Sequence, residues 1–355
     1  MEKFKLGDIC DFINGRAFKP SEWEKKGLPI VRIQNLNDEN AEFNFYSKDI
    51  EEKYIIDNNQ LLFSWSGTPG TSFGAFFWNR GKAVLNQHIF KIIPKIDINI
   101  EFLKYLLNGN LNTIISKSHG GVGLKHITKS ELEKIVVHIP EIKKQEYMVK
   151  TLNQTLEIIN NKKNQLKELD ILIKSQFVEM FGDPILNNKN WNLNKWNEVL
   201  TIKNGRNQKK VEQKDGKYPI YGSGGIISFA NDYICNEDSV IIGRKGNINN
   251  PILVRTRFWN VDTAFGLEPC KEKMIVEYLY YFCYFYNFEK HNKAVTIPSL
   301  TKSDLLNIEI PLPPIELQNQ FAEIVKQIDK QKFEIENSLK EMQELYESLM
   351  EKYFG

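Results

Sequence analysis

Cysteine is scarce in this sequence and is never closely paired. The 355 residues include four cysteines, and no two of them form a Cys-x-x-Cys motif. Four scattered cysteines do not form the pattern of a disulfide framework, and a structural zinc site usually contains a closely spaced pair. We therefore expect neither a disulfide-stabilised fold nor a metal ion bound by this chain.

Long apolar runs and an excess of one charge are also missing. The most apolar run, residues 278–288, is too short to cross a bilayer, which takes roughly 20 residues, so we predict a buried helix there. The sequence opens without the pattern of a signal peptide, and a cytoplasmic protein with no membrane partner is expected. The net charge is only +2, so if DNA is bound, local basic patches or a partner must supply much of the positive field.

Catalytic motifs are absent as well. The sequence has no GxxxxGK(S/T) phosphate loop and no Asn/Asp-Pro-Pro-aromatic tetrapeptide of the kind that adenine methyltransferases carry. Its five histidines are dispersed, and none lies at ligand spacing from a cysteine or a carboxylate. We predict no catalytic residue in this chain and no cofactor bound by it.

A long helical segment is the most regular feature that is present. Residues 142–181 contain no proline or glycine, and apolar residues recur there at alternating steps of four and three. This period places one apolar stripe along a helix, which is typical of a helix that pairs with another long helix. Pro140 suits the helix entrance, and Gly182 suits its exit.

The same pattern returns 173 residues later. Pro140 corresponds to Pro313, Gln145 to Gln318, and Phe181 to Phe354. Each helix of about 40 residues would span roughly 60 Å, and the nearest long partner for each is its own copy. The predicted packing residues are Leu152, Ile159, Leu166, Leu169 and Ile173 in the first helix and Val325, Ile328, Ile335, Leu339, Met342 and Leu349 in the second.

The repeat continues upstream of the helices, in two segments rich in short β-type runs. Asn14-Gly15-Arg16 matches Asn204-Gly205-Arg206 at an offset of 190, and Phe90 matches Phe265 at an offset of 175. An internal repeat of this kind predicts two copies of one structural unit. The expected organisation is α+β, with β-rich domains at 1–139 and 183–312 and long helices at 140–182 and 313–355.

Loops in both β-rich segments combine basic, amide, aromatic and glycine residues. Lys and Arg can read guanine, Asn and Gln can read adenine, and glycine lets the backbone approach a phosphate. A polar surface turn explains any single loop better, but equivalent loops in both repeats favour contact with double-stranded DNA. The candidate residues are Arg16, Lys19, Trp65, Ser66, Thr68, Gln87, His88, Lys117 and His119 in the first segment and Arg206, Lys209, Lys210, Tyr221, Arg244, Lys245, Asn247 and Lys293 in the second.

Several stretches of this repeat are similar to a known family. They are residues 6–11 with Asn14-Gly15, residues 218–225, residues 238–246 and residues 311–320. Together with the two β-rich segments and their long helices, they resemble the specificity subunits of type I restriction–modification systems. The resemblance covers essentially the whole chain.

This resemblance implies a function without catalysis. Each β-rich segment would be a target recognition domain that reads one half of a bipartite, asymmetric DNA site. The helices would pair as an antiparallel coiled coil, giving the chain a pseudo-two-fold repeat, and would act as a spacer. They would also dock two methyltransferase subunits, which bind S-adenosylmethionine and methylate adenine N6. Motor–endonuclease subunits that use ATP with Mg would join to cleave unmodified DNA.

One departure and two alternatives accompany this interpretation. The first segment has Ser64-Trp65-Ser66-Gly67 where the second has Gly243-Arg244-Lys245-Gly246, so the first loop lacks the basic pair. A non-catalytic coiled-coil scaffold whose β-rich units bind proteins or glycans is also compatible with the composition. The third possibility, an enzyme with its own DNA-cleaving or methylating site, is disfavoured by the missing motifs.

Overall fold

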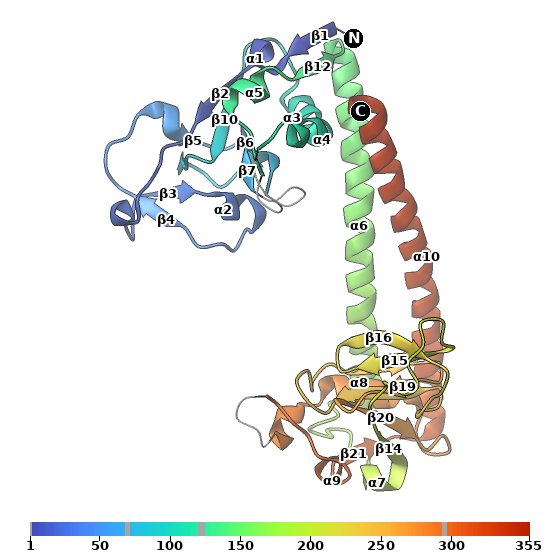
Figure 1. The fold of residues 1–355 in the computed structure, drawn as a ribbon. Helices are drawn as coiled ribbons and strands as arrows, with labels where there is room; N and C mark the ends of the chain where they lie inside the picture. The colour runs from blue at the N-terminus through green and yellow to red at the C-terminus, as the bar shows by residue number, and fades with distance from the viewer. Residues whose placement is uncertain (1, 68–71, 120–124, 293–296) are drawn as a thin grey trace. The chain divides into compact units, whose positions relative to one another are not determined.

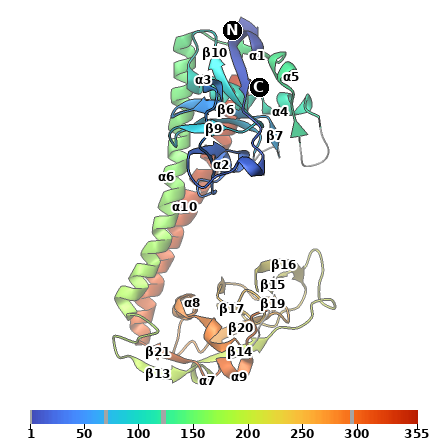
Figure 2. The same ribbon diagram turned by 90° about the vertical axis from the view of Figure 1, so that its left-hand side faces the viewer.

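The computed structural model describes residues 2–67, 72–119, 125–292 and 297–355 (Figures 1 and 2). The chain divides into two compact units. Unit 1 comprises Met1–Asn161 and Leu339–Gly355, and unit 2 comprises Lys162–Ser338. Each unit contains a β-rich part together with one part of each of two long helices.

Unit 1 is built on two four-stranded sheets and two short strand pairs. One sheet has the order β2 (Cys10–Asn14), β10 (Ile89–Pro94), β6 (Gln60–Ser64), β8 (Gly74–Trp78), and the other β4 (Asn44–Tyr46), β3 (Leu28–Val31), β9 (Ala83–Leu85), β5 (Ile55–Ile56). The pairs are β1 (Glu2–Lys5) with β12 (Val136–Ile139) and β7 (Ser66–Gly67) with β11 (Lys125–His126). The short helices are α1 (Leu6–Ile9), α2 (Ile33–Asn37), α3 (Ile100–Gly109), α4 (Leu111–Ser116) and α5 (Lys129–Glu133), with 3-10 turns η1 (Pro20–Glu22) and η2 (Glu52–Tyr54).

Unit 2 repeats this plan with fewer strands. A four-stranded sheet has the order β14 (Leu200–Asn204), β20 (Ala264–Pro269), β17 (Ser239–Gly243), β18 (Ile252–Val254), and a three-stranded sheet has the order β16 (Gly225–Ala230), β15 (Tyr218–Gly222), β19 (Trp259–Asn260). The strand pair is β13 (Asn192–Lys195) with β21 (Glu309–Leu312). The short helices are α7 (Trp196–Val199), α8 (Val276–Phe285), the 3-10 turn η3 (Phe288–His291) and α9 (Lys302–Leu305).

The two long helices are α6 (Ile142–Phe181) and α10 (Ile315–Phe354), each of 40 residues. Both begin just after a proline and end at a glycine, as the sequence predicts. Gly182 follows α6 with φ +78°, a left-handed conformation that suits glycine after the last helical turn. Two long helices with two β-rich parts make this an α+β fold.

Within each unit the two helices pack against one another and against the β-rich part. In unit 1, Met148 and Leu152 of α6 share a core with Phe354 of α10, whose ring lies 5.6 Å from that of Phe102 in α3. In unit 2, Phe181 of α6 lies 5.4 Å from Phe321 of α10, between ring centroids. The beginning of one helix thus meets the end of the other in both units, so the predicted antiparallel pairing is confirmed.

The predicted packing residues all face away from solvent to some degree. Leu152, Ile159, Ile173, Val325 and Ile328 are buried, whereas Leu166, Leu169, Ile335, Leu339, Met342 and Leu349 are half-buried. The predicted buried helix within 278–288 is also present, because α8 buries Tyr278, Leu279, Phe282 and Cys283 in the core of unit 2.

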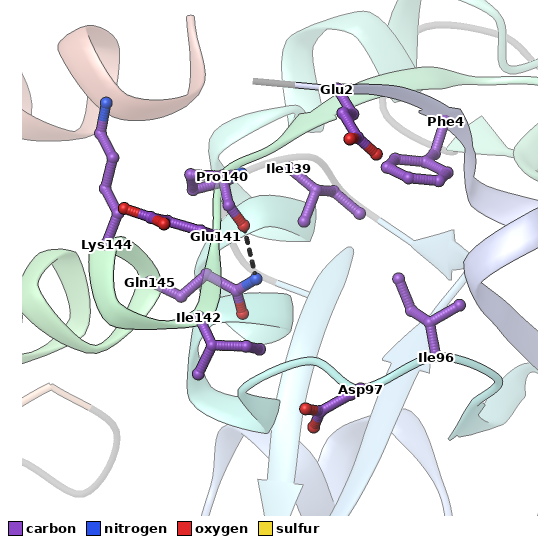
Figure 3. Close-up of a pocket in the computed structure, with 10 residues that line it drawn as sticks. All are labelled: Glu2, Phe4, Ile96, Asp97, Ile139, Pro140, Glu141, Ile142, Lys144 and Gln145. Carbon is purple, nitrogen blue, oxygen red and sulfur yellow. Dashed lines mark hydrogen bonds between the residues drawn. The ribbon is translucent and has the colours of Figure 1, made fainter.

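A buried glutamine attaches each long helix to its β-rich part. Gln145 Nε2 donates to the carbonyl of Pro140 at 2.8 Å (Figure 3). Its Oε1 accepts from the Asn99 amide at 2.9 Å. Gln318 makes the same two bonds in unit 2, to the carbonyl of Pro313 at 2.8 Å and from the Ile275 amide at 3.1 Å. The first turn of each helix is therefore fixed by matching contacts.

Strand register confirms the repeat inferred from sequence. Asn14 pairs with Phe90 between β2 and β10, and Asn204 pairs with Phe265 between β14 and β20. On the next strand, Phe63 of β6 pairs with Phe90, and Ile242 of β17 pairs with Phe265. Because Phe63 and Ile242 are therefore equivalent in the repeat, Trp65 is equivalent to Arg244 and Ser66 to Lys245, as the sequence alignment predicts.

Candidate nucleic-acid interface

Equivalent turns follow β6 in unit 1 and β17 in unit 2. In unit 1, Ser66 pairs with His126 across the β7–β11 ladder. In unit 2, Lys245 forms the corresponding antiparallel bridge with Ser299. The two backbones therefore follow one path, and the turns differ in their side chains.

The turn in unit 1 presents an aromatic and amide surface. The Trp65 indole donates to the Gln87 carbonyl at 3.2 Å, and its ring lies 5.2 Å from that of His88. Gln87 Nε2 is 3.3 Å from His88 Nε2. Gln87 Oε1 and His88 Nδ1 have no hydrogen-bond partner among the described residues. The structure thus brings together three predicted residues from two separate loops.

The turn in unit 2 is basic. Lys245 and Asn247 are exposed, whereas Arg244 is half-buried. The Arg244 guanidinium lies 5.9 Å from the Phe265 ring centroid and 3.4 Å from the Asp262 carbonyl oxygen. These contacts orient the guanidinium, and the neighbouring ammonium of Lys245 stays exposed to solvent.

Arg16 in unit 1 is engaged within its own unit. Its guanidinium forms an ion pair with Glu22 and lies 4.9 Å from the ring centroids of both Phe18 and Tyr46. The pKa of the Glu22 carboxyl is lowered, first by the hydrogen bond from the Lys19 backbone and then by Arg16. Arg16 therefore holds the loop together, while the Lys19 side chain is exposed.

Lys117 and His119 lie at the end of α4. Both are exposed, and they line a hollow of about 370 Å³ with Ser118 and Lys134. His119 Nε2 is 3.0 Å from Glu131 Oε2. This carboxylate partner comes from α5, and the sequence spacing did not reveal it.

The basic loop after β14 has a fixed backbone and free side chains. The Arg206 amide donates to the Asn260 carbonyl, and the Arg206 carbonyl accepts from the Trp259 indole, both at 2.9 Å. A Cβ on the preceding Gly205 would lie 1.8 Å from the Val261 carbonyl oxygen, so glycine is required for this close approach. The side chains of Arg206, Lys209 and Lys210 are all exposed.

Tyr221 lies at the edge of a small core in unit 2. Its ring centroid is 5.5 Å from that of Phe258, and burial raises the pKa of its hydroxyl. The hydroxyl therefore stays protonated at neutral pH and can donate a hydrogen bond. Two further candidates, Thr68 and Lys293, lie outside the described residues.

The structure adds one basic residue that sequence reasoning missed. Lys125 pairs with Gly67 directly beside the Ser66 turn. Its only sequence signal was the neighbouring pair Lys125-His126.

Metal and membrane chemistry find no support in the part of the chain that the structure describes. There, no cluster of three or more His, Cys, Asp or Glu side chains could hold a metal ion. None of the described helices is long and apolar enough to cross a membrane.

Curated relatives of this chain are specificity subunits. It is 23% identical over 401 residues to the type I restriction enzyme MjaVIII specificity subunit of Methanocaldococcus jannaschii, covering 97% of this chain and 91% of that protein. It is also 23% identical over 413 residues to the EcoBI specificity subunit of Escherichia coli, covering 99% of this chain and 85% of that protein.

Solved structures share the fold along the whole chain. The S subunit of a type I restriction–modification system from M. genitalium superposes with a TM-score of 0.60 at 16% identity, covering 100% of this chain and 96% of that one. A second solved structure, described as the structural basis of complex assembly and conformational transition of the type I R-M system, superposes with a TM-score of 0.65 at 17% identity. The superposition covers 99% of this chain and 97% of that one.

The family model for the type I restriction modification DNA specificity domain matches both halves of the sequence. The matched residues are 1–169 and 188–345, so each match takes in one β-rich part and much of the long helix that follows it. The chain therefore belongs to the type I restriction modification DNA specificity family.

Proposed function

We propose that this chain is the DNA-specificity subunit of a type I restriction–modification complex and that each unit reads one half of a bipartite, asymmetric site in double-stranded DNA. The observation that carries the proposal is the family match over both halves of the chain, residues 1–169 and 188–345. The relatives named as specificity subunits cover nearly the full length.

Unlike side chains at equivalent positions support an asymmetric site. Trp65 and Ser66 in unit 1 occupy the positions of Arg244 and Lys245 in unit 2. Arg and Lys read guanine O6 and N7, whereas an aromatic and amide surface offers apolar contact and adenine-type hydrogen bonds. Two readers of one fold with these different surfaces would select different bases.

The paired helices suit a spacer. Two readers joined by a stiff connector gain effective concentration, because binding of one half-site makes binding of the other nearly intramolecular. That gain depends on a connector length that matches the span between half-sites. The 40-residue helices α6 and α10 would supply such a connector.

Catalysis would reside in partner subunits. Two adenine-N6 methyltransferase subunits would bind S-adenosylmethionine, and motor–endonuclease subunits would use ATP with Mg, in the cytoplasm where the DNA lies. Exposed apolar side chains on the long helices support docking: Tyr147 is 65% exposed in unit 1, and Ile171 and Phe333 are 61% and 62% exposed in unit 2. Large exposed apolar side chains are typical of surfaces that bind other proteins.

Mapping of N6-methyladenine tests the proposal directly. DNA is sequenced for methylated adenine from cells that carry the chain and from cells that lack it. We expect a two-part asymmetric motif that is methylated only in the first. An unchanged methylation pattern would overturn the proposal and favour the scaffold alternative. Methylation by the purified chain alone with S-adenosylmethionine would instead assign the enzyme to this chain.

A further inference from the structure

A groove in unit 1 lies beside the first turn of α6, where the sequence analysis placed no site. Its volume is about 530 Å³, within the range of about 300–1,000 Å³ that binding pockets have. Figure 3 shows the side chains of Phe4, Ile96 and Ile139 converging on it, with Ile142 at the start of the helix. Phe4, Ile96 and Ile142 are half-buried, so the groove has an apolar floor that is open to solvent.

The rim of this groove is acidic. Glu2, Asp97 and Glu141 lie along it, and Lys144 is the basic residue among those that line it. All four side chains are exposed. Among the described residues, none of the four has an ion-pair partner. Three carboxylates and one ammonium group therefore surround the apolar floor, which gives the rim a net negative charge.

The walls of the groove are fixed by the fold. Glu2 pairs with Ile139 across the β1–β12 ladder. The buried Gln145 side chain ties Pro140 to Asn99, which follows the segment that carries Ile96 and Asp97. A groove held by a strand pair and a buried amide is preformed, so a ligand would not have to order it.

The equivalent surface of unit 2 lacks the excess of negative charge. Glu2 and Phe4 correspond to Asn192 and Asn194, because β13 pairs with β21 as β1 pairs with β12. Counting on from the ends of β10 and β20 places Lys271 at the position of Ile96 and Glu272 at the position of Asp97. Glu141 and Lys144 correspond to Pro314 and Leu317. At the positions of the groove residues, unit 2 therefore has one Lys and one Glu where unit 1 has three carboxylates and one Lys, although the adjoining Gln145 and Gln318 contacts are the same.

We propose that this groove docks one segment of a protein partner in which a large apolar side chain lies between Lys or Arg residues. The apolar side chain fills the floor formed by Phe4, Ile96 and Ile139, and the flanking cations meet Glu2, Asp97 and Glu141. Asn194 and Lys271 stand in unit 2 where Phe4 and Ile96 form the floor, and Glu272 is the one carboxylate among the residues equivalent to the rim, so the segment binds once per chain. Nucleic acid is excluded, since three carboxylates repel phosphate. This inference does not depend on the proposed DNA-specificity function.

The test uses the full-length chain and a fluorescein-labelled peptide with a Leu-Trp pair between two Lys-Arg pairs. Fluorescence anisotropy gives affinity and stoichiometry at low and high salt. We expect one peptide per chain, and binding weakened about tenfold or more in the variant Glu2→Gln, Asp97→Asn, Glu141→Gln. Amide hydrogen exchange should show protection by the peptide in residues 2–4 and 94–98.

Matched controls separate this site from general attraction to acidic surface. Glu272→Gln, at the equivalent place in unit 2, should leave affinity unchanged. A peptide with Ser-Ser in place of Leu-Trp should bind the wild-type chain about tenfold more weakly or worse, because it cannot fill the apolar floor. Equal binding to the triple variant, two peptides per chain, or no binding to the wild-type chain would each overturn the proposal. Circular dichroism checks that the triple variant is folded.

Discussion

The turn after β6 in unit 1 and the turn after β17 in unit 2 occupy one position in the repeat and carry opposite chemistry. Trp65 packs on His88 in the first, and Arg244 and Lys245 make the second basic. The attachments of the long helices show the reverse, because Gln145 and Gln318 make the same two hydrogen bonds. The long helices and their attachments, here called the frame, are therefore alike in the two units, whereas the turns after β6 and β17 differ.

Helix geometry explains why equivalent positions of the two long helices are always the same number of residues apart, whereas this number varies in the β-rich parts. Each residue turns a helix by about 100°, so one insertion would rotate the apolar stripe away from its partner. Insertions in surface loops cost little, because loop-closure entropy grows slowly with length. The offset of 173 that relates Pro140 to Pro313 also relates Phe181 to Phe354, whereas it drifts from 190 to 175 across the β-rich parts.

The largest expected effect comes from lengthening the frame. We expect insertion of one helical heptad after Asn161 and another after Ser338 to preserve the apolar stripes and lengthen both helices by about 10 Å. If the helices are the spacer, the methylated motif should then show about three more base pairs between its halves. Methylated-motif sequencing measures this. A heptad in α6 alone makes the two helices unequal in length, so the packing contacts at both ends of the pair cannot all form, and it should abolish methylation. An unchanged motif in the double insertion would refute the spacer role.

The next effect compares two equivalent phenylalanines. Phe181 is 2% exposed and contacts the rings of Phe177, Tyr278 and Phe321, whereas Phe354 is 8% exposed and contacts Phe102 within unit 1. Removal of a buried Phe costs about 3–5 kcal/mol. We expect the loss of stability to lie near the upper end of that range for Phe181→Ala and near the lower end for Phe354→Ala.

Hydrogen exchange resolved by unit measures both costs in the full chain. Phe181→Ala should raise exchange in unit 2, and Phe354→Ala should raise it in unit 1. Phe333→Ala, on an exposed side chain, serves as the control and should change stability by less than about 0.5 kcal/mol. A larger loss from Phe354→Ala than from Phe181→Ala would contradict the contact comparison.

A moderate effect is expected at the basic turn of unit 2. Arg244→Ala together with Lys245→Ala should weaken DNA binding by about 1–3 kcal/mol and relax selectivity in one half-site only. Binding assays on DNA with each half-site scrambled in turn measure this. Ser66→Ala, at the position equivalent to Lys245, is the matched variant in unit 1 and should affect only the other half-site. If only the half-site read by unit 1 responded, the assignment of this turn would be wrong.

The smallest effect concerns the N-terminal caps of the short helices α5 and α9. Thr128 Oγ1 accepts from the Glu131 amide at 3.3 Å, and Thr301 Oγ1 accepts from the Asp304 amide at 3.2 Å. Loss of such a cap costs about 1 kcal/mol. Thr301→Ala should cost more than Thr128→Ala, because Thr301 also lies 2.7 Å from the Asp304 carboxylate. Local hydrogen exchange checks the order, and Thr151→Ala within α6 should be neutral or slightly stabilising.

Sequence reasoning succeeded where a pattern is local. The step of four and three predicted α6 and α10 to within a residue or two, because proline and glycine mark their ends. A local pattern can also overrun, because the β-type run in the sequence continues from residue 28 to residue 33 whereas β3 ends at Val31. The buried Asn35 side chain accepts from the Arg32 amide and donates to the Ala41 carbonyl, and these bonds stabilise the helix α2 that begins at Ile33.

The candidate site depended on contacts that no local pattern records. Arg16 was expected to be available for DNA, but Tyr46 reaches it only through the pairing of β3 with β4. The groove at Phe4 was missed for the same reason, because its walls come from both ends of the β-rich part and from α6. The equivalence of Trp65 and Arg244 could be predicted, since an internal repeat supplies its own alignment.

The packing of Phe354 against Phe102 has a consequence for biosynthesis. Translation proceeds at roughly 5–20 residues per second. Part of the core of unit 1 therefore stays open to solvent until unit 2 and the end of α10 have left the ribosome. A stop codon a few turns before the end of α10 would therefore destabilise unit 1, which is synthesised first, and leave the stability of unit 2 unchanged. The core of unit 1 is therefore complete only once the last turn of α10 has packed into it.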